Sequence, residues 1–245
     1  MRDFFLCLGG SATTDGGCGM AAALGVQFLD DHDNSFVPSG ATLGIISRID
    51  MGGIDERVLA SDFTVMCDVN NPLYGPSGAA HVYAPQKGAD NAQVHILDLG
   101  LRHLSKVFLQ TFGTDYAHIP GSGAAGGLGF GCMAFLKAKL ESGIDAILRL
   151  SDFKKHLADA DLIITGEGKL DDQSFSGKVL SGILRNAGDV PVVSICGVCD
   201  VEESKLDEHG LIVFQTSEGI SAAESLENPE KYLKIAVARA LTACL

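Results

Sequence analysis

The chain has 245 residues, 46% of them hydrophobic, which is enough to bury a sizeable core in one or two domains. Only 20% of the residues are charged and the net charge is −13, which excludes a disordered chain and a basic surface for nucleic acid or anionic lipid. The sequence contains no run of about 18 apolar residues, so it predicts no membrane span. The 7 scattered cysteines fit free thiols in a reducing cytoplasm, so we expect a cytoplasmic protein with no membrane partner.

The first predicted elements surround a glycine-rich loop. Residues 4–8 predict a buried strand, which runs into the loop GGSATTDGG at 9–17. A helix over Met20–Leu24 follows and ends before Gly25, a residue type that favours the left-handed conformation after a helix.

A second strand and a long helix follow. Phe63–Val69 predicts a strand that leads into NNPLYGP at 70–76, which suits neither a helix nor a central strand. Asp90 caps a helix that ends at Gly113, and its apolar residues recur every three or four positions, at Val94, Leu97, Leu101, Leu104 and Phe108. This helix is expected to be structural.

A second glycine-rich loop, PGSGAAGGLG at 120–129, precedes a helix expected over Cys132–Leu140. After Gly143 the pattern changes to strands alternating with helices, which indicates βαβ units and a parallel sheet. We expect a boundary near Leu150. The predicted strands are Asp161–Thr165, Val192–Cys196 and Leu211–Gln215, and the predicted helices are Lys178–Asn186, Glu202–Glu208 and Pro229–Leu245.

Glycine-rich loops next to strands or helix starts can bind phosphate, because glycine lets a ligand approach the backbone N–H groups. Gly121-x-Gly123-x-x-Gly126 matches the dinucleotide-binding pattern, but residues 114–120 do not read as the strand that this pattern requires. Gly177-Lys178 lacks the other residues of a Walker motif. Cys196 and Cys199 form a CxxC pair at a strand end, where we interpret them as small apolar residues.

Acidic residues lie within or beside these loops. Asp15 lies in the first loop, Asp68 ends a strand, and Glu167, Asp171 and Asp172 follow the DLIIT strand. Phosphoryl transfer needs carboxylates for Mg²⁺ and for the hydroxyl proton, together with amides or cations for the phosphates. The alternative for each aspartate is a cap on backbone N–H groups in a turn.

Four blocks of the chain resemble the signature blocks of the type I glycerate kinases. They are LGGSATTDGGCG (8–19), CDVNNPLYGPSGAAHVYAPQKGA (67–89), PGSGAAGGLGFG (120–131) and ITGEGKLDDQSFSGK (164–178), in the order and spacing of that family. The resemblance implies ATP- and Mg²⁺-dependent phosphorylation of D-glycerate, typically at the 2-hydroxyl.

The resemblance also implies a two-domain α/β fold with the active site between the domains. Residues 1–150 would form an inserted mixed α/β domain, and residues 151–245 would form the C-terminal half of a Rossmann-like domain with a parallel sheet. The family's blocks resembling APDSFKGS and ADGGEGT are absent from this sequence. We therefore expect part of the family's sequence to lie outside this chain, as in a fragment, a truncated gene or a two-chain enzyme.

The resemblance suggests roles for individual residues. Asp15 is the first choice for the general base, with Asp68 and Lys178 as further catalytic candidates. Amides and side chains that would bind phosphate or the glycerate carboxylate are those of Gly9, Gly10, Ser11, Gly121, Gly123, Gly126 and Lys169. Glu167 and Asp171 would hold Mg²⁺, and Lys87 is a further cation without an assigned role.

The expected partners are glycerate and ATP, and a homodimer is a possible assembly. Two alternatives to an active glycerate kinase stay open. One is a remnant that binds glycerate or nucleotide without turnover, and the other is a kinase of another small hydroxy acid.

Overall fold

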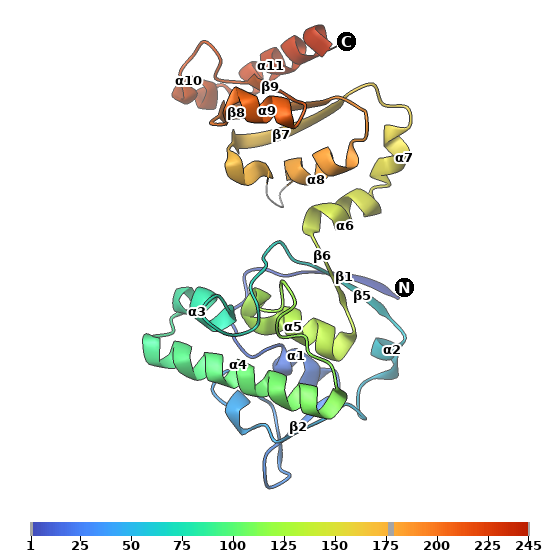
Figure 1. Cartoon of the computed structure of the whole chain (residues 1–245), viewed down its shortest axis with the longest axis vertical. Coiled ribbons are helices and arrows are strands. Elements are labelled where there is room, and N and C mark those ends of the chain that lie inside the picture. Colours follow the sequence, from blue (N-terminus) through green and yellow to red (C-terminus); the bar gives the residue numbers. More distant parts are fainter. Residues whose placement is uncertain (1, 176–178, 245) are drawn as a thin grey trace. The chain divides into compact units, whose positions relative to one another are not determined.

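The computed structural model describes residues 2–175 and 179–244. The chain divides into two compact units, Met1–Gly143 and Ile144–Leu245, each with its own parallel sheet (Figure 1). The units change at the first residue of α6 (Gly143–Leu150), whereas the boundary expected from the sequence lies at the last residue of that helix. The two-domain α/β class is confirmed. The assignment of the units as an inserted domain and a half domain stays a prediction.

The main sheet of the first unit is parallel and has the strand order β1-β5-β6. It consists of β1 (Asp3–Cys7), β5 (Asp62–Met66) and β6 (Lys139–Glu141). The strands near 4–8 and 63–69 were predicted from the sequence, and both are present, but the burial expected of the first is wrong, because the residues of β1 are exposed or half-buried. Because all three strands run in one direction, their carboxyl ends share one edge of the sheet.

A small antiparallel sheet with the order β3-β2-β4 was not predicted. Its strands are β2 (Gln27–Leu29), β3 (Ser35–Phe36) and β4 (Arg48–Asp50). Segments of two or three residues are too short to show a two-residue period, so the sequence carries no signal for them.

Helix α4 (Asn91–Phe112) packs against the core of the first unit, as its apolar stripe predicted. Asp90 and Gln93 form a capping box at its start, and Gly113 ends it with a φ of +73°. The shorter helices are α1 (Cys18–Ala23), η1 (Leu43–Ile45), α2 (Glu56–Leu59), α3 (Ala79–Tyr83) and η2 (Pro85–Lys87). Gly25 follows α1 with a φ of +101°, as expected for a helix end.

The helix expected over Cys132–Leu140 is wrong at both ends. Helix α5 runs over Ala124–Leu136 and begins with three left-handed residues, Ala125, Gly126 and Gly127. Lys137, with a φ of +54°, then ends the helix and the chain enters β6. Close packing of the glycine loop, described below, explains the early start, and pairing with β5 explains the strand at the other end.

The second unit contains a parallel sheet, as predicted, and its strand order is β7-β8-β9. The strands are β7 (Ile163–Leu170), β8 (Val192–Cys199) and β9 (Leu211–Gln215). The helices are α6, α7 (Phe153–Leu157), η3 (Asp172–Phe175), α8 (Val179–Asn186), α9 (Glu203–Glu208), α10 (Ala222–Glu227) and α11 (Pro229–Cys244). Residues of α8 and α11 pack in separate clusters against alternate residues of β8.

The strand pattern predicts that Leu162, Ile163, Ile164, Val193 and Ile195 are buried, and this prediction is only partly confirmed. Ile163, Val193 and Ile195 are buried, but Leu162 is half-buried and Ile164 is 44% exposed. The reason is that β7 lies at an edge of the sheet. Among the described residues, no helix is long and apolar enough to cross a membrane.

Candidate active site

The carboxyl ends of β1, β5 and β6 place three connecting segments at one edge of the first unit's sheet. Residues 9–17 follow β1, residues 67–76 follow β5, and Ser142 follows β6. The N–H of Leu8 donates to the carbonyl of Met66 at 3.2 Å, which keeps the first two segments side by side where they leave the sheet. Ligands of parallel sheets bind at this edge.

The two glycine-rich loops of the first unit contact each other. The N–H of Gly16 donates to the carbonyl of Gly126 at 3.1 Å. Gly126 has a φ of +71°, and a Cβ atom there would overlap the carbonyl of Thr13. Only glycine allows this approach at low energy. Segments more than 100 residues apart in the sequence are therefore joined.

Gly121 and Gly123 are buried and serve the packing of the second loop. The N–H of Gly123 donates to the carbonyl of Asn71 at 2.9 Å. A Cβ atom on Gly121 would lie 3.0 Å from Sγ of Cys67. The amide of Gly123 is therefore already in use, and the predicted role of Gly121, Gly123 and Gly126 in binding phosphate stays untested.

Gly9 and Gly10 are different, because both are exposed and a Cβ atom on either would meet no atom within 4 Å. Next to them, Oγ of Ser11 accepts a hydrogen bond from Nζ of Lys87 at 2.8 Å. Backbone N–H groups in open space beside a cation suit the binding of an anion. Sequence reasoning noted Lys87 but gave it no role, because its contact with Ser11 spans 76 residues.

Asp15 lies at the start of α1 and is half-buried. Its Oδ1 accepts the N–H of Gly17 at 3.0 Å, and its Oδ2 accepts the N–H of Gly19, also at 3.0 Å. The residue therefore caps backbone amides, as the structural alternative predicted. Each carboxylate oxygen keeps a lone pair after one such bond, so the geometry also leaves room for a proton acceptor.

Asp68 lies at the same sheet edge as Gly9, two residues after the end of β5. Its Oδ1 accepts the N–H of Gly143 at 2.8 Å, which links the segments that follow β5 and β6. Asp68 is exposed. Within the first unit the structure thus brings Asp15, Asp68 and the loop of Gly9 to one edge.

The remaining predicted residues belong to the second unit. The expected loop TGEGKL is part of β7, which extends to Leu170 because its backbone pairs with β8 as far as Cys199. Lys169 is exposed and its Nζ lies 3.1 Å from Asp200. Asp171 accepts the N–H of Gln173 at 3.0 Å. Lys178 lies outside the described residues.

Glu167 and Asp171 are the carboxylates predicted to hold Mg²⁺. Both are half-buried, Glu167 near the carboxyl end of β7 and Asp171 one residue after it. In the described part of the chain, no three His, Cys, Asp or Glu side chains are grouped as metal ligands. Mg²⁺ in phosphoryl-transfer sites commonly uses one or two carboxylates together with substrate phosphates and water, so the role predicted for these two residues stays a prediction.

The CxxC pair lies within β8, and all seven cysteines are free. Burial, with smaller contributions from Cys199 and Glu167, raises the pKa of Cys196 to about 12. Redox-active CxxC cysteines have a lowered pKa, so the interpretation of Cys196 as an apolar residue is supported.

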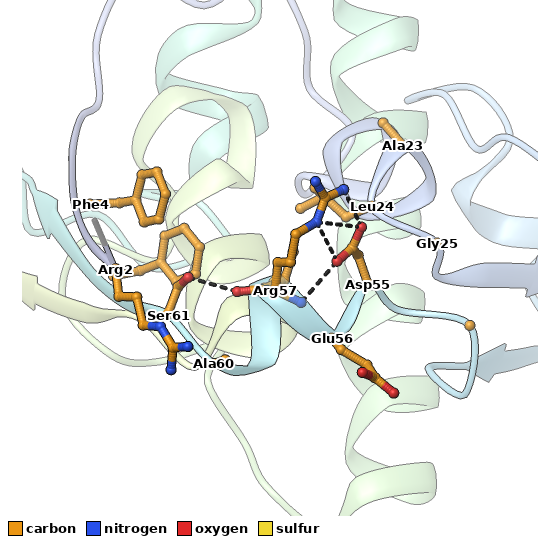
Figure 2. Close-up of a pocket in the computed structure, with 13 residues that line it drawn as sticks. Arg2, Phe4, Ala23, Leu24, Gly25, Asp55, Glu56, Arg57, Ala60 and Ser61 are labelled. Carbon is orange, nitrogen blue, oxygen red and sulfur yellow. Dashed lines mark hydrogen bonds and ion pairs between the residues drawn. The ribbon is translucent and has the colours of Figure 1, made fainter.

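An open cavity of about 1000 Å³ lies elsewhere in the first unit (Figure 2). It is lined by Arg2 and Phe4 of the opposite, amino-terminal end of β1 and by the turn that carries Asp55. Arg57 is already paired with Asp55 through three hydrogen bonds from its guanidinium group. The cavity therefore does not coincide with the sheet edge that holds the glycine loops.

Comparison with known proteins identifies the family. The sequence model of the glycerate kinase family matches residues 1–245. The chain belongs to this family. The glycine loops and the acidic segment of β7 are therefore parts of a glycerate kinase framework.

Curated relatives carry the same name. The chain is 38% identical to a glycerate kinase of Bacillus subtilis over 231 residues, which cover 93% of this chain and 60% of the relative. It is 40% identical to a glycerate 2-kinase of Escherichia coli over 206 residues, which cover 83% of this chain and 54% of the relative. The chain thus spans little more than half the length of these glycerate kinases.

A solved structure from Salmonella typhimurium LT2, which carries the name glycerate kinase 2, has the same fold. The TM-score is 0.78 at 34% sequence identity, and the match covers 100% of this chain and 66% of the other. This similarity supports the two-domain α/β architecture.

Proposed function

We propose that this member of the glycerate kinase family acts in the transfer of the γ-phosphate of ATP to the 2-hydroxyl of D-glycerate, giving 2-phosphoglycerate and ADP. The observation that carries the proposal is the open Gly9–Ser11 segment beside Asp15, within a chain that matches the family model over its whole length. The free thiols favour a reducing, cytoplasmic setting.

The first unit would bind glycerate or a phosphate at the edge of its sheet. The exposed N–H groups of Gly9 and Gly10 and the hydroxyl of Ser11 can donate to anionic oxygens. The nearby ammonium of Lys87 makes this edge locally positive in a chain whose net charge is −13. Local cations and amides are what an acidic protein needs to bind a small anion.

Asp15 would accept the proton of the reacting hydroxyl. The oxygen of that hydroxyl forms a bond to the γ-phosphorus, the bond from this phosphorus to the β–γ bridging oxygen breaks, and ADP leaves. The two amides that bond to the Asp15 carboxylate would fix its orientation during this step. Asp68 is the second candidate for the same role.

Glu167 and Asp171 would hold Mg²⁺, directly or through water, and the bound ion would neutralise phosphate charge. Lys169 would add a further positive charge, because its present partner, Asp200, is an exposed side chain that a phosphate can replace. In this proposal the second unit would bind Mg²⁺ and phosphate oxygens of the nucleotide.

The test is a coupled assay of ADP release with D-glycerate, L-glycerate, glycolate and D-lactate, in which ³¹P NMR identifies the phosphorylated hydroxyl. We expect D-glycerate to be preferred and the phosphate to appear on its 2-hydroxyl. Faster turnover of another acid would reassign the substrate. ATP and glycerate binding without ADP release, measured by calorimetry, would instead identify a binding-only chain.

A further inference from the structure

The loop Gly9–Thr13 depends on one distant side chain. Within residues 2–175 and 179–244, the loop takes part in two hydrogen bonds, and Lys87 donates both. Its Nζ donates to Oγ of Ser11 at 2.8 Å and to the carbonyl of Thr13 at 2.7 Å. In the part of the chain that the structure describes, no hydrogen bond from the sheet or from α1 holds these five residues.

Lys87 is itself firmly placed. It is the last residue of η2, and its N–H donates to the carbonyl of Ala84 at 3.0 Å. The N–H of Gly88 donates to Pro85 at 3.0 Å, and Asp90 then caps the long helix α4. The lysine thus extends from two adjoining helices to a loop that lacks support of its own.

The direction of the Lys87–Ser11 bond determines what Ser11 can do. An ammonium group only donates, so Oγ of Ser11 must accept, and its own hydrogen points away from Lys87. The hydroxyl is therefore left to donate to a further acceptor. Gly9 and Gly10, immediately before it, have open space where a side chain would lie.

The surroundings of Nζ of Lys87 are consistent with a cation held in a fixed position. Partial burial lowers the pKa of Lys87, and the nearby carboxylate of Asp15 acts in the opposite direction. Asp15, the proposed base, comes two residues after Thr13 in the sequence. Because the carbonyl of Thr13 accepts a hydrogen bond from Lys87, the lysine contacts the loop just before this base.

We propose that Lys87 is a positioning residue that holds Gly9–Thr13 so that the Ser11 hydroxyl and the adjacent amides donate to an anionic oxygen of the substrate. The proposal rests on the function proposed above. The anion is a carboxylate or a phosphate, and both present the same acceptor oxygens to these donors.

Lys87→Met removes the charge and both donors at similar length, and Lys106→Met makes the same change on the exposed face of α4 as a control. We expect Lys87→Met to lower kcat/KM by about 10²-fold, the scale on which small displacements act in active sites. Lys87→Arg keeps the charge and should recover part of this loss. Lys106→Met should match the unchanged chain.

The identity of the anion follows from the substrate whose KM rises. A higher KM for D-glycerate with an unchanged KM for ATP assigns the carboxylate, and the reverse assigns a phosphate. Ser11→Ala should show the same selectivity. The double variant with Ser11→Ala and Lys87→Met should have nearly the same KM as Lys87→Met alone, because both changes remove the same Lys87–Ser11 contact.

Hydrogen exchange of the loop tests the same proposal without turnover. Lys87→Met should abolish any protection that glycerate or inorganic phosphate gives to the amides of residues 9–15. If the unchanged chain turns over glycerate and Lys87→Met has the same KM and kcat as Lys106→Met, the positioning role is refuted. If neither anion protects the loop of the unchanged chain and no ADP is released, the proposed function itself is wrong.

Discussion

The candidate residues of the two units are held in different ways. In the first unit, the glycine loops meet through backbone atoms, as where Gly16 donates to Gly126 and Gly123 donates to Asn71. In the second unit, Lys169 and Asp172 lie at the surface, where Lys169 pairs with the exposed Asp200 and Asp172 pairs with the half-buried Lys205. Backbone contacts cannot rearrange without moving the loops, whereas exposed ion pairs exchange readily with a ligand. The junctions at Gly16 and Gly123 in the first unit therefore have a fixed geometry, whereas the surface charges of the second unit can change partners.

The largest expected effect concerns Asp15 in the first unit. Asp15→Asn should lower kcat by about 10²–10⁴-fold, because general base catalysis typically contributes this much. The KM for ATP should change little, since proton transfer does not act in nucleotide binding. Steady-state kinetics with both substrates varied would measure the two effects separately.

Asp90→Asn is the matched control for Asp15→Asn, since Asp90 also caps a helix, α4, with a carboxylate oxygen. It should leave kcat unchanged. A near-normal kcat for Asp15→Asn would move the base to Asp68 or Asp171. Loss of helical signal in Asp15→Asn alone would show that capping is the residue's main contribution.

Gly126→Ala tests the fixed geometry directly. The added methyl group would overlap the carbonyl of Thr13 at a φ of +71°, so we expect the first unit to lose about 3 kcal/mol of unfolding free energy. Amide exchange in α4 reports the stability of this unit. Gly168→Ala on β7 meets nothing within 4 Å and should leave the stability of the second unit, read from β8, unchanged or raised by up to about 1 kcal/mol. Equal losses of unfolding free energy for Gly126→Ala and Gly168→Ala would contradict the proposed difference between the two units.

Asp171→Asn sharpens the comparison on the side of the second unit. If Asp171 holds Mg²⁺ directly or through water, the Mg²⁺ concentration for half-maximal activity should rise about 10–100-fold. Asp161→Asn, an exposed change just before β7, should not alter it. An unchanged Mg²⁺ dependence in Asp171→Asn would leave Glu167 as the remaining candidate.

The smallest expected effect is on the Lys169–Asp200 pair. Its side chains are 55% and 72% exposed, so Lys169→Met should change the unfolding free energy by less than about 1 kcal/mol. If Lys169→Met raises the KM for ATP while the unfolding free energy changes by no more than this, the result would support a contact between Lys169 and a phosphate. If neither the KM nor the stability changes, Lys169 has only a solvated role.

The sequence by itself determined the α/β class, the parallel direction of the strands in the second sheet and the limits of α4. These features depend on local patterns, such as apolar spacing, the Asp90 cap and the glycine after the helix. It also indicated that Asp15 and the glycine loops belong together, through a resemblance that the family match confirms.

Only the tertiary structure decided which candidates are open to a ligand and which are used in packing. Gly9 and Gly123 look alike in the sequence, yet one is exposed and the other donates its amide to Asn71. The extension of β7 to Leu170, the exposure of Ile164 and the bond from Lys87 to Ser11 depend likewise on partners distant in the chain. Local patterns cannot report such contacts, because the free energy of a long-range pairing is fixed by the neighbour that the fold supplies.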